Sequence, residues 1–374
     1  MDHDAVMIHS RQPVGACFDM PGSDRYASRG PGRSKLRIHA KHASKSWQNL
    51  PNIWRFLRDF QCRSPLDLRL VCQRKEVHMS YYVVVGAGPV GRETARLLGE
   101  QGHDVVLTSR SVSDIDLPGV RAMQADATDA AALSRISRGA DAIFMCAMAP
   151  YHRWPTDFFP IVDGTVRAAE AVDAKIILLG NLYSYGENAD SPLRSDLPLD
   201  PTSRKGTVRT IMWQRVSRAN VPAIEVRSSD YLGYGAVTYF SLLALPSVVE
   251  GKPVAFLGDL DADHAWAFIK DAARTLVASA FYTGEWGRAF HVPSQYASPR
   301  DLVRRTAAML GREVAPMRCY SVAEMEALGM HELVEMQYLF DRPLLVDSSD
   351  TEHLLGVKAS SLDVMIADTV RDYL

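Results

Sequence analysis

The sequence predicts an α/β protein in which a doubly wound parallel sheet is followed by a small C-terminal α/β cap. Three observations lead to this prediction. Residues 81–85 form an unbroken apolar run that is typical of a strand buried on both faces. A glycine-rich turn and an amphipathic helix follow it directly. Strand-like and helix-like segments then alternate up to about residue 233, beyond which the alternation weakens.

The turn contains Gly86, Gly88 and Gly91 at G-x-G-x-x-G spacing, with Pro89 and Val90 at the start of the helix. The first glycine permits a tight turn, the second lets the backbone approach a pyrophosphate, and the third lets the helix pack against its strand. The free N–H groups of the helix would hold the pyrophosphate. These five residues are therefore predicted to bind a dinucleotide.

Ser109 and Arg110 follow the second predicted strand, residues 104–107, where an acidic residue would bind the ribose 2′-hydroxyl of NAD. A hydroxyl beside a guanidinium would instead bind a 2′-phosphate. The sequence favours NADP, with NAD possible.

Asp126 and Ala127 follow the third predicted strand, residues 120–124. Both are predicted to contact the cofactor, and Asp126 is the candidate contact to the adenine amino group. The alternative is a helix N-cap, a role better suited to Thr128 or Asp129.

The loop after the fourth strand, residues 142–146, would reach the carboxyl edge of the sheet, where ligands bind in open α/β folds. Ala147 begins this loop and is predicted to contact the cofactor. Tyr151, His152 and Trp154 are candidate substrate contacts, as is Tyr231 beyond the strand at 223–227. An ordinary loop histidine remains the alternative for His152.

The fifth strand, residues 175–179, leads to Asn181, Tyr183 and Tyr185. Lys205 opens the helix that follows, and Arg209 lies one turn later. Like charges at this spacing repel, which indicates either an anion nearby or side chains that extend to solvent.

Residues 79–374 resemble the extended short-chain dehydrogenase/reductase family, in its NAD(P)-dependent epimerase/dehydratase branch. The resemblance rests on the glycine motif, Asp126, the Tyr185-Gly186 pair, Lys205 and the segments 227–233, 268–273 and 354–356. It implies a Rossmann fold. It further implies an NAD(P)-dependent oxidoreductase that acts on a small carbonyl, alcohol or sugar-derived substrate, with a homodimer as one possible assembly.

The catalytic pattern departs from this family, which uses a tyrosine four residues before the lysine and a serine or threonine on strand five. Here Pro201 precedes Lys205 by four residues, and Asn181 takes the place of the serine. Tyr183, Tyr185 or Tyr231 could supply the acid while Lys205 binds the nicotinamide ribose and Asn181 polarises a carbonyl. A structural role is the alternative for Tyr185, because the Tyr-Gly pair of this family is often structural. Alternatively, the reaction needs little acid catalysis, or the protein is a non-catalytic NADP(H)-binding regulator or redox sensor.

The composition limits the remaining classes. The chain has 374 residues and a net charge of −2, and the body presents no basic face for nucleic acid and no membrane span. The five cysteines show neither a metal-binding spacing nor a disulfide framework, so the expected location is the cytoplasm.

The expected division of the chain is a Rossmann core over 79–233 and a substrate-binding cap over 234–374, with minor returns to the core. Helices are expected at 237–249, 264–281 and 299–310, and strands at 252–256 and 289–292. Residues 1–78 are expected to be a disordered extension, or to precede the true translation start at Met79.

Overall fold

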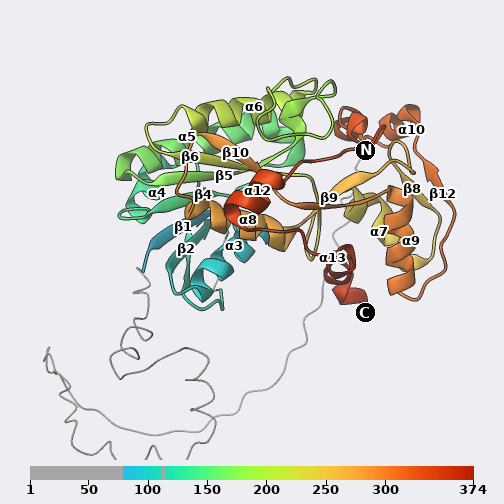
Figure 1. Cartoon of the computed structure of the whole chain (residues 1–374), viewed down its shortest axis with the longest axis horizontal. Coiled ribbons are helices and arrows are strands. Elements are labelled where there is room, and N and C mark those ends of the chain that lie inside the picture. The colour runs from blue at the N-terminus through green and yellow to red at the C-terminus, as the bar shows by residue number, and fades with distance from the viewer. Residues whose placement is uncertain (1–78, 112–114) are drawn as a thin grey trace, which may run out of the picture. The chain divides into compact units, whose positions relative to one another are not determined.

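The main sheet has seven strands, all parallel, in the order β10-β6-β5-β4-β1-β2-β3 (Figure 1). The computed structural model describes residues 79–111 and 115–374, so the expectations for 1–78 lie outside the described residues. The strands, taken across the sheet, are β10 Arg288–His291, β6 Ala223–Ser228, β5 Lys175–Asn181, β4 Ala142–Met145, β1 Tyr81–Val85, β2 Asp104–Ser109 and β3 Val120–Gln124.

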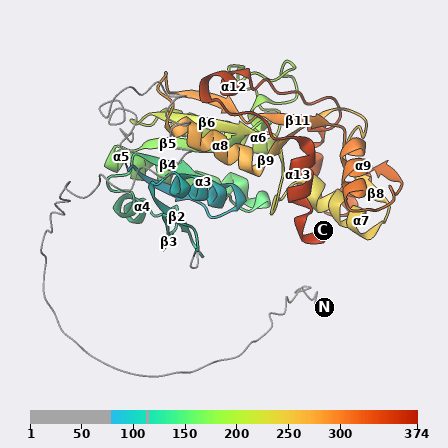
Figure 2. The ribbon, with the colours of Figure 1, turned by 60° about the horizontal axis from the view of Figure 1, so that its bottom comes forward.

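Helices cover both faces of this sheet, which confirms the doubly wound prediction. One face packs against α3 (Pro89–Glu100) and α8 (Ile269–Ala280), which lie side by side in Figure 2. The other face packs against α4 (Ala130–Ile136), α5 (Trp154–Val172) and α6 (Arg204–Ser217). Side chains alternate between the two faces of a strand, so a strand covered on both sides has mostly apolar residues at successive positions. The valine run of β1 meets this need: Val84 joins one core cluster, and its neighbours Val83 and Val85 join the other.

The cap contains two smaller sheets beside the carboxyl edge of the main one (Figure 1). The first has the order β11-β9-β7, and the second pairs β12 with β8. The helices of the cap pack around a third apolar cluster, which includes Phe240, Trp266 and Phe340. The elements of the C-terminal part are β7 Asp230–Leu232, the π-helical turn η3 Phe240–Ala244, α7 Leu245–Glu250, β8 Val254–Phe256, β9 His264–Phe268, β11 Ser294–Ala297, α9 Pro299–Met309, β12 Met317–Cys319, α10 Val322–Ala327, α11 His331–Val334, α12 Ser349–Leu355 and α13 Leu362–Thr369.

Two expectations for this region were wrong. The expected helix 264–281 begins only at Ile269, because residues 264–268 form β9, which pairs with both β7 and β11. Pairing on two sides overrides the local preference of these residues. The strand expected in the cap at 289–292 is β10, which extends the main sheet beyond β6. Together with α8 and α12, which contact each other, β10 brings the chain back to the core.

Candidate functional site

A cavity of 510 Å³ lies at the carboxyl edge of the main sheet. Its lining comes from the glycine turn, from the residues that follow β4, β5 and β6, and from the cap. The cap contributes residues 235–239 and four leucines, Leu242, Leu333, Leu339 and Leu344. An apolar hollow of this size with a few polar groups is typical of a site for a small molecule or cofactor.

The three glycines of the turn have different structural roles. Gly86 has a φ of +111°, and a Cβ there would lie 2.5 Å from the backbone N of Ala147. A Cβ on Gly91 would lie 1.9 Å from the carbonyl oxygen of Gly86. Gly88 has an ordinary φ of −71°, and a Cβ there would meet no atom within 4 Å. Packing therefore requires the first and third glycines, whereas the second leaves open space beside the cavity.

This open space suits the pyrophosphate of a dinucleotide. Gly88 is the N-cap of α3, and no side chain caps the helix. The first-turn N–H groups of Val90 and Gly91 have no intrahelical acceptor at this position, and Pro89 has no N–H at all. The positive end of the helix dipole and these donors favour an anion here. The predicted cofactor residues therefore fit the phosphates of a nicotinamide dinucleotide.

The residues predicted at the adenosine end lie on adjacent strands. Ser109 ends β2 and accepts a hydrogen bond from the backbone N–H of Ser111 at 3.4 Å, and Arg110 beside it is exposed. The carboxylate of Asp126 accepts hydrogen bonds from the N–H and hydroxyl groups of Thr128, both at 2.9 Å, and these bonds lower its pKa. The N-cap of α4 is Asp129, so the alternative role of Asp126 as a helix N-cap does not apply.

Three tyrosines contribute phenol groups to the cavity lining. Tyr151, Tyr183 and Tyr239 all line it, and the hydroxyl oxygens of Tyr151 and Tyr239 are 2.8 Å apart. Burial raises the pKa of Tyr151 to about 12, and it raises the pKa values of Tyr183 and Tyr239 well above the usual range. All three phenols are therefore protonated at neutral pH.

Lys205 is not part of the cavity lining, but its side chain contacts the ring of Tyr151. Its Nζ atom is 2.6 Å from Oε1 of Glu335 and 4.3 Å from the ring centroid of Tyr151. Glu335 also accepts a hydrogen bond from the backbone N–H of Arg204 at 3.0 Å, so the cap and α6 are joined here. Sequence reasoning missed Glu335, because 130 residues separate it from Lys205.

Asn181 and Tyr231 line the cavity, as predicted residues of the site. The Oδ1 atom of Asn181 accepts a hydrogen bond from the backbone N–H of Tyr183 at 3.2 Å. The amide NH₂ of Asn181 is therefore the group left for a ligand. The hydroxyl of Tyr231 is buried and has no hydrogen-bond partner among the described residues.

Tyr185 and His152 do not take part in the cavity. The hydroxyl of Tyr185 accepts a hydrogen bond from Nη1 of Arg227 at 2.6 Å and lies 2.7 Å from Nε2 of His291. Tyr183 and Tyr185 belong to one 3₁₀ turn, in which residues two apart point in different directions. His152 is exposed, whereas Trp154 lines the cavity. The expectation that Tyr185 lies near the crevice as a proton donor was therefore wrong.

An Asp–His pair at the rim of the cavity was missed by sequence reasoning. Asp230 lines the cavity, and its Oδ2 atom is 2.9 Å from Nε2 of His264. The His264 ring stacks on Phe340 with 4.2 Å between centroids. Asp230 belongs to β7 and His264 to β9. The pair was not predicted because residues 264–268 were expected to be helical, and the pairing of β9 with β7 is what brings the two residues together.

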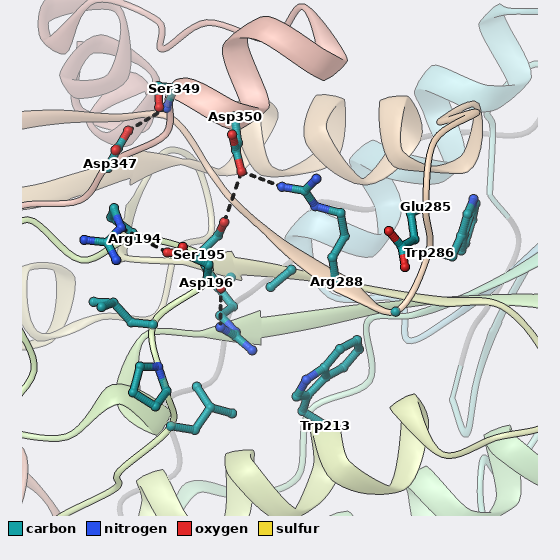
Figure 3. Close-up of a pocket in the computed structure, with 16 residues that line it drawn as sticks. Arg194, Ser195, Asp196, Trp213, Glu285, Trp286, Arg288, Asp347, Ser349 and Asp350 are labelled. Carbon is teal, nitrogen blue, oxygen red and sulfur yellow. Dashed lines mark hydrogen bonds and ion pairs between the residues drawn. The ribbon is translucent and has the colours of Figure 1, made fainter.

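A larger cavity, of 840 Å³, lies along the edge strand β10 (Figure 3). Its charged side chains largely pair with one another. Arg194 and Asp196 are 3.0 Å apart, Arg288 pairs with Asp350, and Asp347 accepts a hydrogen bond from Ser349. Because these charges are already satisfied and the glycine turn is not part of this lining, we assign the site to the smaller cavity.

Within residues 79–111 and 115–374, no group of three or more His, Cys, Asp or Glu side chains is arranged to bind a metal ion. The same residues contain no helix with the length and apolar character that crossing a membrane requires.

The family model described as "NAD dependent epimerase/dehydratase family" matches residues 82–291, which is more than half of the chain. This protein therefore belongs to the NAD-dependent epimerase/dehydratase family. The match begins at the second residue of β1 and ends with β10, so it covers nearly the whole main sheet.

Solved structures show the same fold. The Bordetella bronchiseptica enzyme WbmH in complex with NAD+ is 19% identical, with a TM-score of 0.64. UDP-glucuronic acid 4-epimerase from Bacillus cereus in complex with NAD is 17% identical, with a TM-score of 0.64. MoeE5 in complex with UDP-glucose and NAD is 17% identical, with a TM-score of 0.63. Each similarity covers 78% of this chain and 98% of the other. No curated protein matches the chain.

Proposed function

We propose that this protein is an NADP-dependent oxidoreductase that reduces a small carbonyl compound in the 510 Å³ cavity. One observation carries the proposal: the glycine turn and protonated phenols line the same cavity. The bound cofactor would supply the hydride, and the protein would place the substrate, exclude water and donate the proton.

The preference for NADP rests on Ser109 and Arg110. Arg110 forms no ion pair with any described residue, and it lies at the end of β2. Its guanidinium and the hydroxyl of Ser109 together suit a 2′-phosphate. A carboxylate that would repel this phosphate is absent from both positions.

Tyr183 and Asn181 are the residues that we assign to the chemistry. The NH₂ group of Asn181 would donate a hydrogen bond to the carbonyl oxygen and polarise it. The hydroxyl of Tyr183 would then protonate the oxygen as negative charge develops there. Because its pKa is raised, Tyr183 keeps its proton at neutral pH, and the phenolate that alcohol oxidation would need as a base is scarce. The protonation state of the site therefore suits carbonyl reduction better than alcohol oxidation.

Lys205 has a positioning role in this proposal. In the related enzymes the corresponding lysine is expected to bind the nicotinamide ribose, but here Glu335 occupies its ammonium group. The ammonium group of Lys205 instead makes a cation–π contact with the ring of Tyr151. The ion pair of Lys205 with Glu335 and its contact with the Tyr151 ring together position Tyr151 between α6 and the cap.

The engagement of Lys205 by Glu335 also favours a second candidate, a non-catalytic NADP(H)-binding regulator. Both candidates need the cofactor site, but only the oxidoreductase consumes NADPH.

An assay of the full chain with NADPH and a panel of aldehydes and ketones, some neutral and some with a carboxylic acid, distinguishes the two candidates. Absorbance of the reduced nicotinamide should fall with at least one carbonyl compound. The activity should be lost in Tyr183→Phe. It should be retained in Tyr282→Phe, a matched control outside the cavity that packs on Phe290. Tight NADPH binding without turnover across the panel would favour the regulator.

A further inference from the structure

The cavity contains a buried arginine without a carboxylate partner. Arg209 is 4% exposed and lines the cavity. None of the ion pairs among the described residues involves it, and its Nε atom has no hydrogen-bond partner there. A guanidinium keeps its charge in proteins, and buried charges are normally paired. Arg209 does not extend to solvent, so the alternative that repulsion from Lys205 is relieved by a solvent-exposed Arg209 was wrong.

The contacts that Arg209 does make fix its orientation. Nη1 donates a hydrogen bond to the carbonyl oxygen of Leu179 at 3.2 Å. Nη2 lies 3.6 Å from the sulfur of Met148, a weak acceptor. The guanidinium also lies over the rings of Trp154 and Phe158, with 4.4 and 4.7 Å to their centroids. One N–H edge, formed by Nε and Nη2, is therefore left without a strong acceptor.

A second donor without a partner lines the same cavity. The hydroxyl of Tyr231 is buried and accepts or donates no hydrogen bond among the described residues. Burial raises its pKa, so the phenol carries its proton at neutral pH. The neighbouring hydroxyl of Ser228 donates instead to the carbonyl oxygen of Ser229 at 3.0 Å. Buried polar groups in folded proteins are nearly always hydrogen-bonded. Two unsatisfied donors in one cavity indicate a ligand with acceptor atoms.

The acidic groups around the cavity do not neutralise Arg209. The Oδ2 atom of Asp230 is within hydrogen-bonding distance, 2.9 Å, of Nε2 of His264. Glu225 is paired with Arg227 at 2.7 Å, and it interacts with Arg209 only at longer range. The cationic edge of Arg209 is thus available to an anion that enters the cavity.

The position of Arg209 excludes the cofactor phosphates as this anion. Arg209 contacts the end of β5, which two strands, β4 and β1, separate from β2 and its Ser109. Neighbouring strands are about 4.8 Å apart, so the 2′-phosphate would lie roughly 14 Å away. The pyrophosphate at Gly88, at the end of β1, would lie roughly 10 Å away by the same spacing.

We propose that Arg209, assisted by Tyr231, binds the carboxylate of the substrate, so that the protein acts on carbonyl compounds that also carry a carboxylic acid. The Nε–Nη2 edge of arginine matches the two oxygens of a carboxylate. This inference rests on the proposed function, because it names the substrate class for the same cavity.

Binding to the NADP+-saturated full chain tests the inference without requiring turnover. The probes are three matched pairs: 3-formylbenzoate, 4-oxopentanoate and 2-oxobutanoate, each with its methyl ester. Titration calorimetry gives the dissociation constants. We expect at least one acid to bind about tenfold or more tightly than its ester, the value of one charge-assisted hydrogen bond.

Three variants assign this preference. Arg209→Met, which fills similar space without the charge, should abolish it, and Arg209→Lys should retain part of it. Arg215→Met is the matched control on the same helix, because Arg215 is paired with Asp163 and stacks on Phe159 outside the cavity. The control should retain the full preference, and all variants should bind NADP+ like the wild type.

Equal binding of acid and ester in all three pairs, or a preference that survives in Arg209→Met, would overturn the inference. Weakened NADP+ binding in Arg209→Met would also overturn it, because the guanidinium would then serve the nicotinamide amide. Failure of the wild-type chain to bind any nucleotide would instead contradict the proposed function. NADPH consumption with neutral carbonyl compounds alone would support the proposed function while refuting the carboxylate site.

Discussion

Alanine substitutions at Gly88 and Gly91 separate nucleotide binding from folding within one turn. Gly88→Ala adds a methyl group where no protein atom lies within 4 Å, at a φ of −71° that any residue adopts. We expect its free energy of unfolding to stay within about 0.5 kcal/mol of the wild type. The methyl group occupies the space that the pyrophosphate needs, so the NADPH dissociation constant should rise about tenfold or more, equivalent to about 1.4 kcal/mol.

Gly91→Ala should behave in the opposite way. The new Cβ would lie 1.9 Å from the carbonyl oxygen of Gly86, which is backbone and cannot move aside without distorting the turn. Overpacking of this kind costs about 1–3 kcal/mol. Alanine regains about 1 kcal/mol of helix propensity, and the unfavourable contact is expected to exceed this gain.

Urea denaturation and titration with NADPH measure the two effects on the same preparations. The account predicts a stable Gly88→Ala that binds poorly and a Gly91→Ala that is destabilised. Wild-type NADPH affinity in Gly88→Ala would refute the assignment of the pyrophosphate to this turn. Wild-type stability in Gly91→Ala would refute the packing argument.

Three further predictions concern single residues. Arg110→Ala should raise the dissociation constant for NADP about tenfold or more and leave that for NAD nearly unchanged, as measured by calorimetry; equal effects would contradict the 2′-phosphate assignment. Burial lowers the pKa of His291 to about 4 in the folded chain. In the unfolded chain this histidine is protonated below about pH 6.5, whereas in the folded chain it stays neutral down to about pH 4. The free energy of unfolding should therefore fall as the pH decreases through this window, by at most about 3 kcal/mol, and a flat profile in urea titrations would contradict this assignment. Glu335→Gln leaves the ammonium of Lys205 buried without a counter-charge and should lower stability by about 3 kcal/mol in the same titrations, whereas an unchanged midpoint would show that the ion pair is dispensable.

The core of the fold could be predicted because its determinants are local. The valine run of β1, the glycine turn and the helix after it depend on residues adjacent in the chain. The strands that follow are recognisable as short apolar runs. The burial of β1 on both faces was therefore visible before any long-range contact was known.

The errors arose where distant residues decide the structure. Residues 264–268 become a strand because β7 and β11 flank them, and the local sequence does not reveal either neighbour. β10 joins the main sheet through pairing with β6, more than 60 residues earlier. In the same way, the partner of Lys205 comes from the cap.

The candidate site was predictable in part. Tyr183, Asn181 and Tyr231 were placed near the crevice from their positions after strand ends, and they do line the cavity. Tyr185 was placed there by the same rule, but its hydroxyl interacts with Arg227 and His291 instead. Strand ends indicate where a loop begins, but the direction of each side chain depends on the turn that follows.

The central claim is that the cavity at the glycine turn binds a nicotinamide dinucleotide. Titration calorimetry of the full chain with NADPH, NADP+, NADH and NAD+ tests it most directly. The account predicts one equivalent bound, more tightly for the phosphorylated pair than for NADH and NAD+. Folded protein that binds none of the four would contradict it.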